Sequence, residues 1–178
     1  MTHSHNCLLR GLNAIVLQAP CVASVSQPNY NEQDVKDLLF FVESWVKMVD
    51  HHHHTEETCM FPEIEQLANE PGLLSHAQRQ HKDFHGGLQN LGNYANEMQQ
   101  TPRKYRWEAM EEIIDGFAPS LTKHLYEEIG EILALERLDS DGLRKCWAKA
   151  EEVAKARGKI AYLVGLFFTS FPCFVHES

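Results

Sequence analysis

The sequence has few cysteines, and none of them forms a Cys-x-x-Cys motif. The 178 residues include five cysteines, an odd number spread along the chain, which argues against a disulfide framework and against a thiolate zinc site. Isolated cysteines of this kind are typical of reduced thiols. The first twenty residues also lack the apolar core and the small-residue cleavage site of a secretory signal. We therefore expect a cytoplasmic protein.

Positive charge and long apolar runs are also scarce. Lys and Arg number 16 against 25 Asp and Glu, and the resulting net charge of −9 disfavours nucleic acid and anionic lipid as partners. The longest uncharged run, residues 160–175, contains Pro172 and is shorter than the roughly 20 residues of a membrane-spanning helix. We expect this run to be a tail packed on the rest of the protein, with membrane contact unlikely.

Strand-like alternation is absent as well, and apolar residues follow a helical period along most of the chain. The sequence therefore predicts an all-α protein, an antiparallel four-helix bundle with an additional C-terminal helix. We expect the bundle over residues 1–136 and the accessory helix with the apolar tail over 137–178. The expected helices cover about 2–18, 31–68 with a kink or end near Pro62, 73–99, 101–135 and 142–157.

Imidazole and carboxylate side chains stand on the apolar faces of the four bundle helices. Residues four apart lie one turn above each other on a helix, so each such pair can point at one centre. Burying these groups without partners costs about 1 to 3 kcal/mol each, and a shared metal would compensate all of them together. The candidate metal ligands are His5, His52, Glu56, His81, His85, His124 and Glu128.

Two registers are open on the second helix, because four consecutive histidines precede Glu56 and Glu57. The apolar positions around them favour His52 with Glu56, and His53 with Glu57 is the alternative. We expect His51 and His54 to point elsewhere. The remaining histidines, His3, His76 and His176, have no partner at helical spacing and are expected on the surface.

The types of candidate ligand narrow the choice of metal. Without cysteine pairs, imidazole and carboxylate suit iron, manganese, zinc or copper. Two divalent ions held by two glutamates keep about two positive charges uncompensated, which favours a bound hydroxide, oxide or other small anion. The residues therefore predict a dinuclear site with room for a small ligand.

The pieces that carry this pattern resemble the hemerythrin-like, or HHE cation-binding, domain. They are His5-Asn6, HHHHTEETCMFPEIE at 51–65, QHKDFHGGL at 80–88 and HLYEEIGEIL at 124–133. The resemblance implies an antiparallel bundle around a non-haem di-iron centre. It further implies that His81, His85 and His124 bind one iron, that His5 and His52 bind the other, and that Glu56 and Glu128 bridge them.

The chain departs from the oxygen-carrying hemerythrins at Ile129, where they have an aspartate; Glu128, one residue earlier, matches the wider HHE group. Oxygen transport therefore does not follow from the resemblance. We expect a di-iron protein, with zinc or manganese as alternatives, that reversibly binds or senses dioxygen, peroxide or iron. The alternatives are a di-iron peroxidase or oxidase, and a zinc-bound or metal-free helical interaction module.

Overall fold

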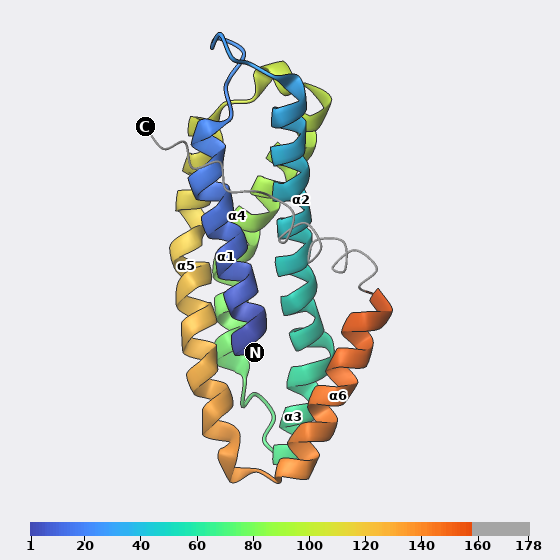
Figure 1. Cartoon of the computed structure of the whole chain (residues 1–178). Helices are drawn as coiled ribbons and strands as arrows, with labels where there is room; N and C mark the ends of the chain where they lie inside the picture. Colours follow the sequence, from blue (N-terminus) through green and yellow to red (C-terminus); the bar gives the residue numbers. More distant parts are fainter. Residues whose placement is uncertain (158–178) are drawn as a thin grey trace, which may run out of the picture.

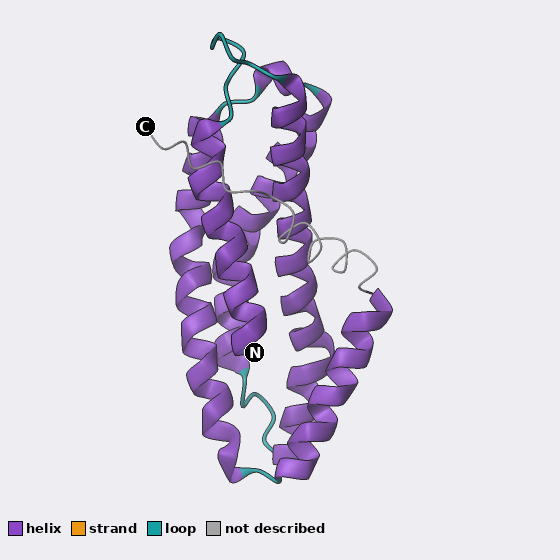
Figure 2. Ribbon diagram, in the orientation of Figure 1, coloured by secondary structure: helices purple, strands orange, loops and turns teal. Residues whose placement is uncertain are grey.

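In the computed structural model, which describes residues 1–157, every regular element is helical, as predicted (Figure 2). Short 3₁₀ turns follow α1, α4 and α5, and a π-helical turn, Glu56–Met60, joins α2 to α3. The expected apolar tail at 160–175 lies outside the described residues. The α-helices are α1 (Thr2–Gln18), α2 (Glu32–Thr55), α3 (Phe61–Ala68), α4 (Ser75–Gln100), α5 (Trp107–Leu133) and α6 (Ser140–Arg157).

Helices α1, α2, α4 and α5 form the antiparallel bundle, and each runs opposite to the one before it (Figure 1). Helix α1 is short, so the N-terminus stops short of the lower end of the bundle (Figure 1). Helix α6 packs beside the lower part of α2, the π turn and α3. None of the described helices combines the length and the apolar character that crossing a lipid bilayer requires.

The helix ends follow local chemistry. The side chain of Asn31 accepts a hydrogen bond of 2.9 Å from the backbone N–H of Gln33, which caps the first turn of α2. Helix α5 begins at Trp107 rather than at residue 101. The reason is that Arg106 is extended and its backbone N–H and carbonyl both bond the Tyr94 hydroxyl, so the chain turns before the helix starts.

The apolar core is divided in two along the bundle axis. A large cluster fills the part formed by α1, α2, α4 and α5, and includes Trp45, Phe117 and Leu125. A smaller cluster lies beyond it, between the π turn, α3, α6 and the ends of α4 and α5, and includes Phe61. Each of the four bundle helices carries buried polar residues where its sequence passes from one cluster toward the other. The fold therefore places a polar layer inside the molecule.

Helices α4 and α5 approach closely at Gly87. A Cβ atom there would lie 2.5 Å from Cβ of Phe117, whereas one at the neighbouring Gly86 would meet nothing within 4 Å. We predict that Gly87→Ala lowers the free energy of unfolding by about 1 to 3 kcal/mol, because the Phe117 Cβ is fixed to the α5 backbone and cannot yield. Gly86→Ala is the matched control and should raise it by about 0.5 to 1 kcal/mol through helix propensity.

Urea unfolding followed by far-ultraviolet circular dichroism, with both variants in the metal-free form, measures the two changes. Equal effects of the two substitutions would contradict the close approach of α4 and α5 at Gly87.

Candidate metal centre

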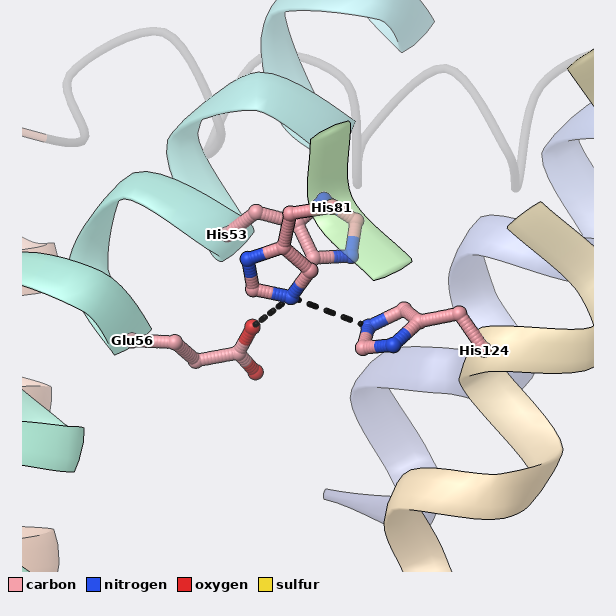
Figure 3. A group of neighbouring side chains, drawn as sticks. All are labelled: His53, Glu56, His81 and His124. Atoms are coloured by element: carbon pink, nitrogen blue, oxygen red, sulfur yellow. Dashed lines mark hydrogen bonds and ion pairs between the residues drawn. The ribbon is translucent and has the colours of Figure 1, made fainter. Parts of the chain in front are cut away.

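The polar layer consists of two groups of buried side chains that share one carboxylate. Within each group one nitrogen or oxygen atom of every residue lies within 4.8 Å of the others. Glu56 belongs to both groups and is 2% exposed, so it stands between two candidate centres. The first group is His53, Glu56, His81 and His124, drawn in Figure 3, and the second is His5, His52, Glu56 and Glu128.

In the first group, three helices aim nitrogen atoms at one point. Nε2 of His81 lies 3.1 Å from Nε2 of His124 and 3.7 Å from Oε2 of Glu56 (Figure 3). Two nitrogens bound at right angles to one ion, at about 2.1 Å each, would be about 3.0 Å apart. The separation of these two nitrogen atoms is therefore the one that neighbouring ligands of a single ion have.

The outer nitrogens of these two rings are already engaged. Nδ1 of His81 donates to Oε1 of Glu57 at 2.8 Å, and Nδ1 of His124 donates to Oε1 of Gln80 at 3.2 Å. The amide of Gln80 is oriented by its own bond to Glu127. With both Nδ1 protons donated outward, the two Nε2 atoms present lone pairs to each other. A cation between them removes this repulsion.

In the second group, His5 is fixed in the same way. Its Nδ1 donates to the carbonyl oxygen of Leu125 at 2.8 Å, which leaves Nε2 facing Oε2 of Glu128 at 3.0 Å. Nε2 of His52 lies 3.0 Å from Oε1 of Glu56. His5 is 1% exposed although it is the fifth residue of the chain. The first helix therefore contributes a well-held side chain to the layer.

Both registers of the second helix contribute. Neighbouring residues on a helix point about 100° apart, so His52 turns toward His5 of α1 while His53 turns toward His81 and His124 of α4 and α5. Glu56 lies between them and Glu57 bonds His81 from outside. The sequence left open whether His52 or His53 faces the site. Both do, because α2 contacts α1 on one side and α4 with α5 on the other, and the register of His52 with Glu56 alone does not include His53.

The structure does not bring His85 to the other predicted ligands. It is exposed and belongs to neither group. The inward face of α4 passes through Gln80 and Phe84, with His81 at its edge. His85 lies about 40° further round the helix, past that edge, so the four-residue spacing carries it out of the bundle. The expectation that His81 and His85 share a centre is therefore wrong for His85. His53 of α2 is the third histidine of the group that contains His81 and His124.

The other histidines of the described chain lie outside the layer, as expected. Nε2 of His51 is 3.2 Å from the carbonyl oxygen of Ala154 in α6, and His54 and His3 are exposed. His76 is exposed beside Glu127 and Glu131. The predicted surface position of His176 lies outside the described residues.

The layer contains most of the buried polar atoms that lack a hydrogen bond. Of eight such side-chain atoms in the described chain, seven belong to it: Nε2 of His5, His52 and His53, and both carboxylate oxygens of Glu56 and Glu128. Four of these atoms form two close pairs, His5 with Glu128 and His52 with Glu56, each 3.0 Å apart, and an unsatisfied buried group costs about 1 to 3 kcal/mol, so each pair needs a proton or a cation between its atoms. Imidazole and carboxylate are the donors that first-row metal ions take, so the residues fit a metal.

Burial sets the protonation of the metal-free layer. It lowers the pKa of His52 to about 3, and it lowers the pKa values of His53, His81 and His124 as well, because a charged ring is poorly solvated inside the bundle. It raises the pKa of Glu56 to about 8 and also raises that of Glu128. Near neutral pH these four histidines are therefore neutral and can bind a metal, whereas Glu56 must first lose a proton.

Comparison with known proteins agrees with this geometry. The Hemerythrin HHE cation binding domain matches residues 1–135. A relative described as dimeric xanthone biosynthesis cluster protein R11, from Cryptosporiopsis sp. (strain 8999), is 38% identical over 152 residues. The alignment covers 85% of this chain and 55% of the relative, so this chain spans about half of that protein. No solved structure matches the chain.

Replacing His53 and His85 by alanine, one at a time, tests which of these histidines belongs to the layer. We predict that His53→Ala lowers the bound metal by about one ion per chain or weakens that ion by at least about tenfold, because a buried donor is lost. His85→Ala is the matched control on an exposed ring and should leave the metal content unchanged. Elemental analysis after dialysis against a weak chelator gives the answer. Loss of metal in His85→Ala but not in His53→Ala would instead support His81 and His85 as ligands of one ion.

The raised pKa of Glu56 predicts how metal binding depends on pH. Below about pH 8 the metal must displace a proton from this carboxyl, so the apparent affinity should rise by about tenfold per pH unit and then level off above pH 8. Competition titrations with a chromophoric chelator between pH 6 and 9, corrected for the chelator's own protonation, measure this slope. An affinity that is constant from pH 7 to 8 and falls only below about 6.5 would instead indicate control by histidines of ordinary pKa.

Proposed function

The chain belongs to the hemerythrin HHE cation-binding family, and on this basis we propose that it is a non-haem di-iron protein that reversibly binds or senses dioxygen, peroxide or iron. Each of the two buried groups would hold one ion, and Glu56, which belongs to both, would contact both ions. Zinc and manganese are the alternative metals for the same donors.

The observation that carries the proposal is the pair of facing Nε2 atoms of His81 and His124. They lie 3.1 Å apart with both Nδ1 atoms hydrogen bonded outward, an arrangement that favours a cation between the rings. Independent support comes from the second group, where His5 is held by the Leu125 carbonyl with its Nε2 turned inward. Three rings from three helices are thus oriented by acceptors outside the layer.

The two groups favour different roles. The first offers three imidazoles and the second offers two, with one carboxylate shared. When bound, iron would supply reversible ligation of a small molecule at the second centre, which has the fewer imidazole donors. The side chains of this chain would exclude water from the first centre, since His53, His81 and His124 are packed against Phe84. In the second group the side chain of His52 is 15% exposed, so this group is less completely covered than the first.

A second candidate function is an enzyme that turns over peroxide or dioxygen. The relative's name places that protein in a biosynthesis cluster, a setting that would suit a catalytic metal site. Steady consumption of peroxide by the iron-loaded protein, abolished in a folded His124→Ala variant, would favour this candidate. Stoichiometric binding without turnover would favour the first.

Anaerobic loading with iron(II), followed by metal analysis and a spectrum after exposure to air, tests the proposal. We expect about two irons per chain and a near-ultraviolet absorption of an anion-bridged ferric pair, as the family implies. Iron should also raise the unfolding temperature, because a ligand that binds only the folded state at 100 times its Kd adds about 2.7 kcal/mol. Failure to retain iron, with no change in the unfolding temperature, would reject it in favour of a metal-free helical module.

A further inference from the structure

A cavity opens beside the second group of the polar layer. It has a volume of about 450 Å³ and lies between the first turns of α1, the end of α2 with the π turn, and the end of α6. His52 and Glu56 contribute to its wall, with Nε2 of His52 3.0 Å from Oε1 of Glu56. Polar atoms of the layer therefore lie at one side of a sizeable space.

The cavity is far larger than a diatomic ligand needs. A water molecule occupies roughly 30 Å³ of liquid, and dioxygen is of comparable size. Cavities of about 300 to 1,000 Å³ are those that bind organic molecules in proteins. Access of dioxygen to the second group therefore does not account for this volume, and a molecule about the size of a substituted aromatic ring fits it.

The rest of the wall is mainly apolar and contains no lysine or arginine. Leu8, Met48, Met60 and Trp147 contribute apolar surface, and the ionisable groups besides His52 and Glu56 are the α-amino group of Met1, Cys7, two histidines and the exposed Glu151. The α-amino group is the one fixed cation of this wall and Glu151 balances its charge, so an anion would meet no net positive charge here, and the chain as a whole carries −9. Burial of a charged ligand against these walls is costly, so the lining selects a neutral molecule.

Helix α6 completes the cavity and belongs to this chain rather than to the matched domain. The domain match ends at residue 135, whereas α6 covers Ser140–Arg157 and contributes Trp147, Ala150 and Ala154 to the wall. Nε2 of His51 meets the Ala154 carbonyl oxygen at 3.2 Å, which ties the end of α6 to α2 at the cavity. The addition therefore builds a wall next to the polar layer.

We propose that this cavity binds a neutral, mainly apolar organic molecule, about the size of a substituted phenol, with a hydroxyl or carbonyl oxygen directed toward His52 and Glu56. The inference rests on the proposed metal function only for the role of the bound molecule, which would lie next to the second centre. Binding itself depends on the side chains of the wall and can be measured in the metal-free protein.

The test uses the full chain and 4-methylphenol, which is neutral at pH 7 because its hydroxyl resembles that of tyrosine. We expect saturable binding with a Kd below about 1 mM by isothermal titration calorimetry, together with a change in tryptophan fluorescence. The similar but anionic 4-hydroxyphenylacetate should bind at least about tenfold more weakly, because the wall carries no net positive charge to offset the loss of its hydration.

A matched pair of variants on α6 locates the binding. Ala154→Phe fills the cavity and should weaken 4-methylphenol binding by at least about tenfold, whereas Ala156→Phe, two residues on and exposed, should leave it unchanged. Equal behaviour of the two variants, or absence of saturable binding to the parent chain, would overturn the proposal. Binding to a protein that retains no iron would uphold the cavity and reject the metal function, so the two failures are distinguishable.

Discussion

Five imidazoles and two carboxylates face one another inside an otherwise apolar bundle, and the rest of the structure depends on how this layer is neutralised. The layer lies between two separate apolar clusters, and all of its members except His52 are buried. Protons can neutralise Glu56 and Glu128, as their raised pKa values indicate, but protons leave the inward nitrogen atoms of His81 and His124 facing each other. A metal pair satisfies the carboxylates and the imidazoles together, which protonation does not.

The helices are held in the positions that this layer needs. Trp45 of α2 donates from Nε1 to the carbonyl oxygen of Leu8 at 2.9 Å, and His5 donates to the carbonyl oxygen of Leu125, so α1 is bonded to both α2 and α5. Such bonds explain why a residue so near the chain end is fully buried, where a free end would fray. On the far side, the absence of a side chain at Gly87 lets α4 approach α5 close to His81 and His124.

Much of the fold and most of the layer could be predicted from the sequence, because a helical period of apolar residues determines which face is buried. Six of the seven predicted ligands lie in the two groups. The two errors, at His85 and His53, arise because the helical period was assumed to give one inward residue in each turn. His85 follows the spacing of His81 but passes the edge of the inward face, while His53 is buried because α2 faces α1 on one side and α4 with α5 on the other. The apolar series Ala77, Phe84, Leu88 and Leu91 is the sequence signal that could have placed that edge, because His85 lies outside it.

The surroundings of the two groups differ in a way that bears on their chemistry. Phe61 stacks on His81 with ring centroids 5.9 Å apart, and Phe84 packs on His53 and His124, so aromatic side chains cover the first group. The second group instead adjoins the cavity that α6 completes. In the proposed di-iron function, the first group would hold its ion among aromatic side chains, whereas the second would leave room for a ligand beside its ion. Because the bundle alone supplies the first and the accessory helix borders the second, changes in α6 would alter what reaches the centre without altering the ligands that hold it.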